Sequence, residues 1–214
     1  EDIAPGAGLI VPICVAAMPD GRLLVGEKQG RVWAVKNGIK NPTPLWARQS
    51  EVLDSYDRGL LGIAVDPRYF VNHYVYFLYT VDPDSNNVET NIESFGRLTR
   101  YQVNFTDSLS VDPASRTILM GVDWAHGPLE ASGSHTVGAL RWGTDGSLLV
   151  SIGDGADFTV GPDAGGLQPN AFLPGRTDPA EDIGAYRSQF IKSLDGKVLR
   201  LDPANGHGYP SNPF

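Results

Sequence analysis

The chain has 214 residues and a formal net charge of -8 at neutral pH. This acidic balance argues against a nucleic-acid partner, because phosphate binding relies on clustered Lys and Arg. No stretch approaches the roughly eighteen consecutive apolar residues of a membrane-spanning helix, so no membrane span is expected. The 25 glycines and 16 prolines punctuate short β-rich runs, which favours an all-β fold.

The first predicted unit is a meander of strands joined by tight turns. Its strands are expected at residues 10–17, 22–26 and 31–36, with 42–46 as a fourth, outer strand. Pro19-Asp20-Gly21 and Gly30 supply the turns between the first three. Cys14 lies in the first strand, where we expect a buried thiol that packs as a small hydrophobic side chain.

The second unit repeats this scheme over a longer stretch. Its strands are expected at residues 59–65, 73–80, 97–104 and 116–121. A turn at Asp66-Pro67 separates the first two. In the run 73–80, apolar residues occur at both odd and even positions, so both faces of that strand should be covered by other parts of the protein.

The third unit opens with a hairpin whose ends carry polar side chains. Strands are predicted at 138–142 and 147–152, because the Asp145-Gly146 pair between them tolerates the positive φ of a tight turn. His135 precedes the first strand and Asp154 follows the second. These ends lie side by side in an antiparallel hairpin, so we expect the imidazole and the carboxylate within hydrogen-bonding reach.

A long insertion separates this hairpin from its third strand, which is expected at 196–202. Within the insertion, Asp178-Pro179-Ala180-Glu181 has the aspartate cap, the proline and the acid of a helix start, so a short helix is predicted to about Lys192. The rest of 156–187 is rich in Gly, Pro and Asp. Ordered loops of this length are usually functional.

The three units share one pattern of apolar strand, Asp-containing turn, apolar strand, spacer, Gly-Arg or Gly-Lys, and third strand. Repeated four-stranded antiparallel units of about 40 to 50 residues predict a β-propeller. We expect one partial propeller domain over residues 1–214, with blades at about 9–50, 59–121 and 134–203, the last carrying an insertion at 156–195. About three blades cannot close a ring, so further sequence or another chain should complete it.

Four segments occur in the order of a known family: PDGRLLVGEKQGRVWAV, RGLLGIAVDPRYFVNHYVYFLYT, SHTVGALRWGTDGSLLVSIGDG and SLDGKVLRLDPANG. On these segments the chain resembles the glucose/sorbosone dehydrogenase family, which includes soluble quinoprotein glucose dehydrogenases and aldose sugar dehydrogenases. The resemblance covers nearly the whole chain. It implies half of a six-bladed propeller, with pyrroloquinoline quinone (PQQ) and calcium (Ca2+) at the centre of the top face.

The resemblance also implies roles for three residues. His135 matches the general base that removes a proton from the sugar hydroxyl while hydride passes to the quinone, and Asp154 matches the aspartate that orients this base. Imidazole titrates near neutral pH, and a carboxylate on its other nitrogen fixes the tautomer. Asp57 matches a polar position that lines the quinone pocket and so is a cofactor-binding candidate together with His135.

The sequence departs from the family pattern at two places. The glutamine-containing segment that follows the Gly-Asp of the glucose dehydrogenases is here Asp157-Phe158-Thr159-Val160, and Ser134 stands where they carry aspartate. The resemblance further implies that the Lys and Arg residues that clamp the quinone carboxylates, and most calcium ligands, lie beyond Phe214.

Each candidate also has a purely structural interpretation. His135 could cap a strand, Asp154 could serve ordinary turn chemistry, and Asp154 with Asp157 could instead bind calcium. Arg187 and Gln189 could reach the central face, although a solvated helix face is the simpler expectation. The four tryptophans are expected to fill the spaces between blades: Trp33, Trp46, Trp124 and Trp142.

Three functions stay open from the sequence. The leading one is a periplasmic or secreted PQQ-dependent sugar dehydrogenase, which needs a sugar and an electron acceptor as partners. The second is a non-catalytic extracellular propeller that binds carbohydrate or protein through the same face. The third is a calcium-stabilised hydrolase of the lactonase type, for which the sequence offers no convergent set of carboxylates. Because the chain starts at Glu1 without a methionine, a processed or truncated N-terminus is expected.

Overall fold

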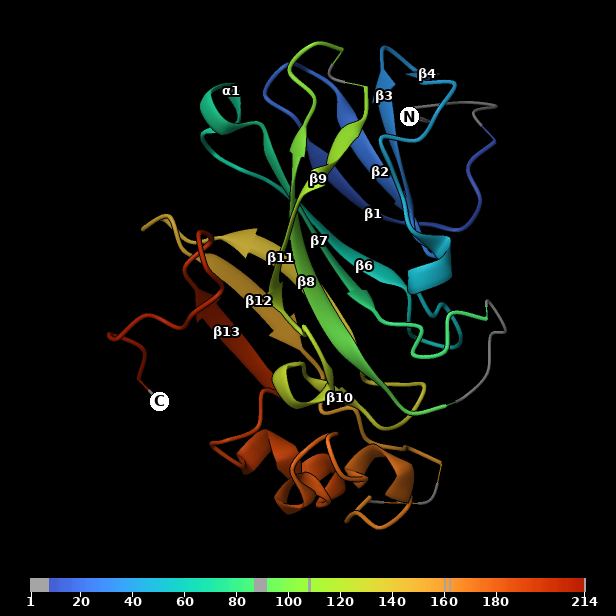
Figure 1. Cartoon of the computed structure of the whole chain (residues 1–214), viewed down its shortest axis with the longest axis vertical. Helices are drawn as coiled ribbons and strands as arrows, with labels where there is room; N and C mark the ends of the chain where they lie inside the picture. Colours follow the sequence, from blue (N-terminus) through green and yellow to red (C-terminus); the bar gives the residue numbers. More distant parts are fainter. Residues whose placement is uncertain (1–7, 87–91, 108, 160, 162, 214) are drawn as a thin grey trace.

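Three antiparallel sheets, one after another along the chain, make up the fold (Figure 1). The computed structural model describes residues 8–86, 92–107, 109–159, 161 and 163–213. Helical segments within these residues are short: α1 (Tyr69–Asn72) and the 3-10 turns η1 (Gln49–Glu51), η2 (Trp124–His126), η3 (Pro169–Phe172), η4 (Pro179–Glu181) and η5 (Gly184–Gln189). The predicted all-β class is confirmed.

Sheet 1 has four strand positions, and its outermost position is split. Its strands are β1 (Pro12–Ala17), β2 (Leu23–Glu27), β3 (Arg31–Lys36), β4 (Ile39–Lys40) and β5 (Trp46–Ala47). Both β4 and β5 pair with β3, one beside each end of it. The prediction of one outer strand at 42–46 is therefore wrong. Pro42 and Pro44 lie between the two pieces, and proline has no amide to donate to a strand ladder.

Sheet 2 has the same plan. Its strands are β6 (Leu60–Val65), β7 (Tyr74–Thr80), β8 (Ser94–Val103), β9 (Val111–Met120) and β10 (Leu129–Glu130). Both β9 and β10 pair with the outer edge of β8. The predicted strand at 116–121 starts too late, because Asp112-Pro113 has the composition of a turn. A bulge carries β9 past this proline, and the Ser115 hydroxyl there accepts the Gln102 amide at 2.8 Å.

Sheet 3 contains the predicted hairpin. Its strands are β11 (Val137–Trp142), β12 (Leu148–Ile152) and β13 (Lys197–Leu201), paired in that order. Within the described residues, an isolated bridge between Leu201 and Gly208 stands where the other two sheets carry their split outer strand.

The predicted helix from Asp178 to about Lys192 is wrong. Asp178 does cap a turn, since its carboxylate accepts the Ala180 amide at 2.9 Å, but this turn is only η4. Gly184 then adopts a left-handed φ of 55°, and a Cβ at this position would lie 2.3 Å from the Asp163 carbonyl oxygen. The chain makes this close contact instead of continuing a helix, and a separate 3-10 turn, η5, begins at Gly184.

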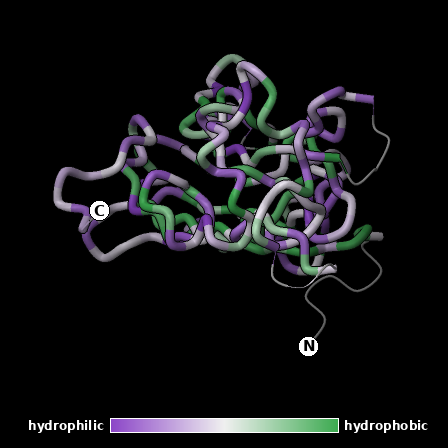
Figure 2. Tube along the Cα trace, turned by 90° about the horizontal axis from the view of Figure 1, so that it is seen from below, coloured by the Kyte–Doolittle hydropathy of each residue, from purple (hydrophilic) through white to green (hydrophobic). Residues whose placement is uncertain are grey.

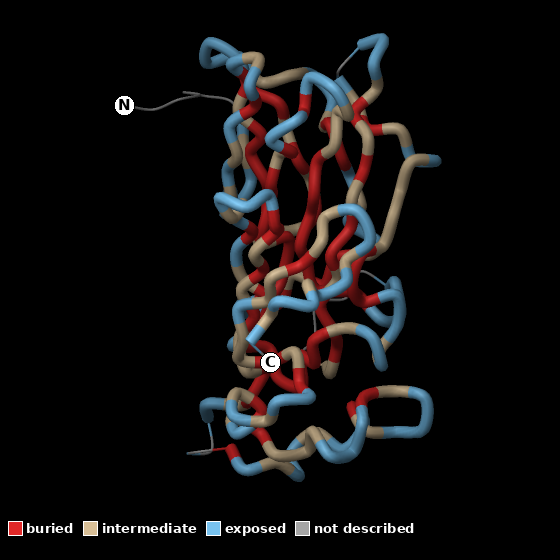
Figure 3. Tube along the Cα trace, turned by 90° about the vertical axis from the view of Figure 1, so that its left-hand side faces the viewer, coloured by how far each residue is buried: buried red, intermediate tan, exposed pale blue. Residues whose placement is uncertain are grey.

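Strand β7 lies in the middle of the fold and is covered on both faces. Its odd-numbered side chains Val75, Phe77 and Tyr79 pack into a core with residues of sheet 1, whereas Tyr76 and Leu78 pack into a second core with residues of sheet 3. All five are at most 1% exposed. Apolar residues at both odd and even positions predicted that both faces of this strand are covered, and this prediction is confirmed. Figure 3 shows buried residues along the strands.

Two tryptophans fill the spaces between sheets, as predicted. Trp46 of β5 stacks on Phe77 with ring centroids 4.6 Å apart, and Trp142 of β11 donates its indole N–H to the Val65 carbonyl of β6 at 2.7 Å. The Trp33 ring contacts the Lys40 ammonium of the same sheet at 4.1 Å, and for this residue the prediction stays a prediction. Trp124 packs against a different partner, the Arg176 guanidinium of the insertion, at 4.3 Å.

The two terminal sheets leave apolar side chains in solvent. Ile13 and Val15 on β1 are 47% and 55% exposed, and Val198 on β13 is 70% exposed. Strand β6 packs between β1 and β11, so the first strands of the three sheets are neighbours. An arc of propeller blades has this arrangement, since its end sheets meet no further blade within the chain.

Hydrophobic and hydrophilic residues are interleaved along the chain (Figure 2). Such interleaving is typical of strands, whose successive side chains point to opposite faces. Among the residues that the structure describes, no helix has both the length and the apolar character to cross a membrane.

Cys14, the one cysteine of the chain, is partly buried on β1, with its Sγ 3.7 Å from the Leu60 carbonyl oxygen of β6. Burial raises the pKa of this thiol to about 12. Because the thiolate is the reactive form, we expect the native protein to react very slowly with the thiol reagent DTNB at about pH 8, and the unfolded chain to react at once. Rapid labelling of the native protein would contradict burial of this thiol between sheets 1 and 2.

Candidate active site

The predicted histidine and aspartate lie at adjacent ends of the sheet 3 hairpin. Val137 pairs with Ile152 at this end of β11 and β12, and the two candidates follow directly beyond that pair. The His135 Nδ1 atom lies 2.9 Å from the Asp154 Oδ1 atom. The predicted hydrogen-bonding proximity is thus confirmed. The His135 side chain remains 46% exposed and that of Asp154 25% exposed, so the pair is open to a reactant.

The backbone at this end of the hairpin is closely packed. The amides of Gly153 and Gly155 donate to the carbonyls of Thr136 and His135, at 2.9 and 2.8 Å. A Cβ at position 153 would lie 2.1 Å from the His135 carbonyl oxygen, so only glycine fits. His135 itself has a φ of 57°. Left-handed backbone is unusual for a residue other than glycine, and such strain is concentrated at functional sites.

The hydrogen bond to Asp154 determines which nitrogen of His135 can act as a base. Asp154 Oδ1 also accepts the Ala156 amide at 3.1 Å. An ionised carboxylate only accepts, so Nδ1 must carry the imidazole proton. The lone pair of neutral His135 then lies on Nε2, and among the described residues no hydrogen-bond donor engages that atom. The geometry therefore leaves a proton acceptor directed away from Asp154.

Asp57 lies beside His135, although it belongs to the loop before β6. Its Oδ2 accepts the His135 amide at 3.4 Å, and its amide donates to the Gly133 carbonyl at 2.9 Å. The Thr136 hydroxyl donates to the Asp57 carbonyl at 3.2 Å. The structure thus brings all three predicted site residues together, from two sheets that are neighbours in the fold.

Arg187 supports the His135–Asp154 pair through the backbone of Asp154, a role that the sequence did not predict. It was expected on a solvated helix face, yet it is only 1% exposed. Its Nε donates to the Asp154 carbonyl at 2.9 Å and lies 3.2 Å from Asp195 Oδ2, while its Nη1 donates to the Glu181 carbonyl at 3.1 Å. Gln189, by contrast, is exposed as expected.

Arg58 supports the segment that leads into His135. Its Nη2 donates to the carbonyls of Glu130 and Ser132, both at 2.9 Å, and its Nε lies 3.6 Å from Glu130 Oε2. Both side chains of this ion pair are at most 1% exposed. Glu130 Oε1 in turn accepts the Val137 amide at 3.2 Å, at the start of β11. Burial raises the pKa values of the Glu130 and Asp195 carboxyls.

The described residues contain no group of three or more His, Cys, Asp or Glu side chains placed to hold a metal ion. Asp157 does not join Asp154, because its carboxylate accepts the amide and hydroxyl of Thr159 at 2.7 and 2.6 Å. Cations near His135 already have partners as well: Arg58 and Arg187 hold carboxylates and carbonyls, and Lys28 donates to the Tyr56 carbonyl. These three cations are therefore already engaged within the described part of the chain.

Antiparallel sheets of this plan, with their first strands adjacent, place the chain among the β-propellers. The family model for Glucose / Sorbosone dehydrogenase matches residues 9–214, so the chain belongs to this family.

Individual proteins are similar to this chain in sequence and in fold. An uncharacterised protein of Synechocystis sp. strain PCC 6803 is 29% identical over 217 residues, which cover 97% of this chain and 44% of the relative. A solved protein of Thermus thermophilus, described as a glucose dehydrogenase, is 25% identical with a TM-score of 0.67, and the match covers 100% of this chain and 49% of that one. The PQQ-bound aldose sugar dehydrogenase of Streptomyces coelicolor shares the fold at 24% identity and a TM-score of 0.62, over 100% of this chain and 50% of its own. The chain spans about half the length of these relatives.

Proposed function

We propose that the protein containing this chain is a PQQ-dependent sugar dehydrogenase, with His135 as its general base. The observation that carries the proposal is the 2.9 Å contact between His135 Nδ1 and Asp154 Oδ1, which leaves Nε2 as the proton acceptor. Membership of the glucose/sorbosone dehydrogenase family supports an oxidoreductase acting on sugars. The PQQ-bound Streptomyces coelicolor structure supports the choice of cofactor.

Each residue has a defined part in this proposal. His135 Nε2 accepts the proton of the sugar hydroxyl that is oxidised, and the Asp154 carboxylate stabilises the resulting imidazolium while it keeps the ring oriented. Asp57 holds the His135 amide and forms one wall of the cofactor pocket. When bound, PQQ would supply the redox step by accepting hydride from the sugar carbon.

The rest of the propeller has to complete the pocket. The cationic groups for the quinone carboxylates and the calcium ligands are proposed to come from the remaining blades, whether these belong to the same chain or to another. The exposed apolar faces of β1 and β13 are the surfaces on which those blades would pack. A periplasmic or secreted location and an electron acceptor form part of the same proposal.

Reconstitution tests the proposal directly. The full-length protein is incubated with PQQ and Ca2+, and reduction of an electron-accepting dye is followed with a panel of aldoses. We expect reduction that requires both the quinone and a sugar, and that is absent when either is omitted. A protein that neither binds PQQ nor reduces the dye would instead be a non-catalytic propeller that binds carbohydrate or protein.

A further inference from the structure

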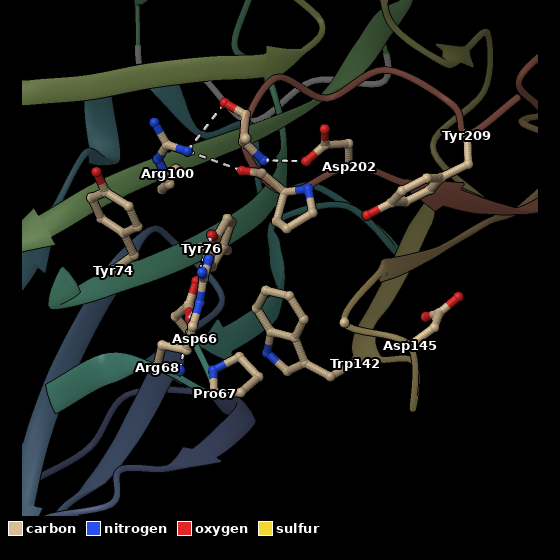
Figure 4. A pocket seen from close by; sticks show the side chains of 13 residues that line it. Asp66, Pro67, Arg68, Tyr74, Tyr76, Arg100, Trp142, Asp145, Asp202 and Tyr209 are labelled. Atoms are coloured by element: carbon tan, nitrogen blue, oxygen red, sulfur yellow. Dashed lines mark hydrogen bonds and ion pairs between the residues drawn. The ribbon is translucent and has the colours of Figure 1, made fainter. Parts of the chain in front are cut away.

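A cavity of about 440 Å³ lies between sheets 2 and 3, at the end of the hairpin opposite His135 (Figure 4). It is lined by the turn after β6, the Asp145-Gly146 turn between β11 and β12, and the loop after β13. Strand β11 separates it from His135, and six residues of strand span roughly 20 Å. The cavity is therefore distinct from the candidate active site.

Aromatic rings form the walls of this cavity. Trp142 is fixed by its hydrogen bond to the Val65 carbonyl and by the edge of Tyr76, whose ring centroid lies 5.4 Å away. Tyr209 projects from the loop after β13 and rests against the Arg200 guanidinium at 4.3 Å. Figure 4 shows the Tyr209 hydroxyl pointing into the cavity. Rings held in this way can receive an apolar ligand surface without rearrangement.

The acidic groups that line the cavity are already engaged. Asp66 accepts the Tyr76 hydroxyl at 3.0 Å, and Asp145 accepts two bonds from Arg200 at 2.9 and 2.6 Å. Asp202 accepts the amide of Ala204 at 2.8 Å. These carboxylates would repel an anion, yet their existing partners reduce the attraction that they could offer to a cation.

One of the two arginines that line the cavity is engaged in the same way, whereas the other lies mostly in solvent. Arg100 donates to the carbonyls of Pro203 and Ala204 at 3.0 and 3.2 Å, and its guanidinium lies 4.4 Å from the Tyr74 ring centroid. Arg68 points into solvent, with Nε 3.9 Å from Asp66. A ligand suited to this lining carries no net charge, has an apolar face for the rings, and has hydroxyls that can share the remaining lone pairs of the carboxylates.

We propose that this cavity binds a neutral pyranose sugar, at a site separate from His135. A pyranose ring presents C–H groups on one face and hydroxyls around its edge, which matches the Trp142 and Tyr209 rings and the polar rim of Asp145 and Asp202. The volume lies within the range of small-molecule sites, about 300 to 1,000 Å³. The site does not depend on the proposed dehydrogenase activity.

Sugar binding without PQQ tests the proposal. Glucose, galactose and maltose are titrated into the full-length, quinone-free protein, and binding is followed by saturation-transfer NMR and calorimetry. We expect at least one sugar to bind, and Tyr209→Ala to weaken that binding about tenfold or more. Tyr209→Phe keeps the ring and should bind more tightly than Tyr209→Ala. The matched control Tyr186→Ala, at an exposed tyrosine of the insertion, should bind as the wild type does.

Circular dichroism shows whether each variant is folded. If Tyr209→Ala does not fold, the milder Tyr209→Phe takes its place in the comparison with the wild type. The proposal is wrong if none of these sugars binds in the millimolar range. It is also wrong if His135→Ala abolishes binding while both Tyr209 variants retain it, because the single sugar site would then be the active site.

Discussion

Replacing His135 with alanine should lower kcat/KM for PQQ-dependent sugar oxidation by about 10²- to 10⁴-fold, the usual contribution of a positioned general base. The reason is the loss of Nε2, the nitrogen that the Asp154 contact at 2.9 Å leaves free to accept a proton. The measurement is the initial rate of dye reduction by the reconstituted full-length protein. PQQ affinity is measured separately, so that loss of the cofactor is not mistaken for loss of the base.

A second His–Asp pair in the chain provides a matched control. His126 Nδ1 lies 2.5 Å from Asp123 Oδ1, but both side chains are more than half exposed and belong to the η2 turn. His126→Ala should leave the rate unchanged. Asp154→Asn, which keeps the size of the side chain but removes its charge, should fall between the wild type and His135→Ala. Activity of His135→Ala within about twofold of the wild type would show that another group takes the proton.

Local sequence patterns were sufficient to predict the parts of the fold that depend on neighbouring residues. The Asp145-Gly146 turn sets the register of β11 and β12 next to it, and a bulge between Val137 and Leu140 then shifts this register by one residue, which places His135 opposite Asp154. Apolar residues at both parities of β7 correctly indicated two covered faces. The outer strands were predicted poorly, because edge strands form through pairing with β3 and β8, and prolines there redirect the chain into short pieces.

The support beneath the site could not be predicted from composition. Charged residues are ordinarily exposed, and no local pattern around Arg58 or Arg187 indicates that these two side chains are buried. Glu130 is far along the chain from Arg58, and the two meet only once β10 and β6 are assembled into sheet 2. Asp57 was identified by family resemblance alone, and its contact with His135 also depends on two loops that meet in three dimensions.

Arg187→Met should have the largest effect on stability, lowering the free energy of unfolding by about 3–5 kcal/mol. The substitution keeps much of the side-chain volume but leaves the Asp195 carboxyl, which is fully buried, without its cation at 3.2 Å. It also removes the donor to the Asp154 carbonyl, so activity should fall as well. Urea unfolding at neutral pH gives the free energy, and Arg141→Met, at an exposed arginine of β11, should change it by less than about 0.5 kcal/mol.

The pH dependence of this loss distinguishes a charge effect from a packing effect. Burial, with the nearby Glu181 and Glu130 carboxylates, raises the pKa of Asp195 well above its usual value, and Arg187 opposes that rise. In Arg187→Met the folded state should therefore hold the Asp195 proton to higher pH than the unfolded chain does. A folded state that binds more protons loses stability as pH rises, so the destabilisation should be smallest at and below the ordinary aspartate pKa, about 4, and grow toward neutral pH.

The double variant Arg187→Met/Asp195→Asn separates the contribution of the Asp195 charge from that of the hydrogen bonds of Arg187. An asparagine has no charge to desolvate, so the double variant should be more stable at neutral pH than Arg187→Met alone, and the pH dependence that arises from residue 195 should disappear. A double variant no more stable than Arg187→Met, with the same pH profile, would mean that Arg187 acts through its hydrogen bonds to the Asp154 and Glu181 carbonyls alone. Either result assigns the role of this arginine, because the two contributions respond differently to loss of the carboxylate.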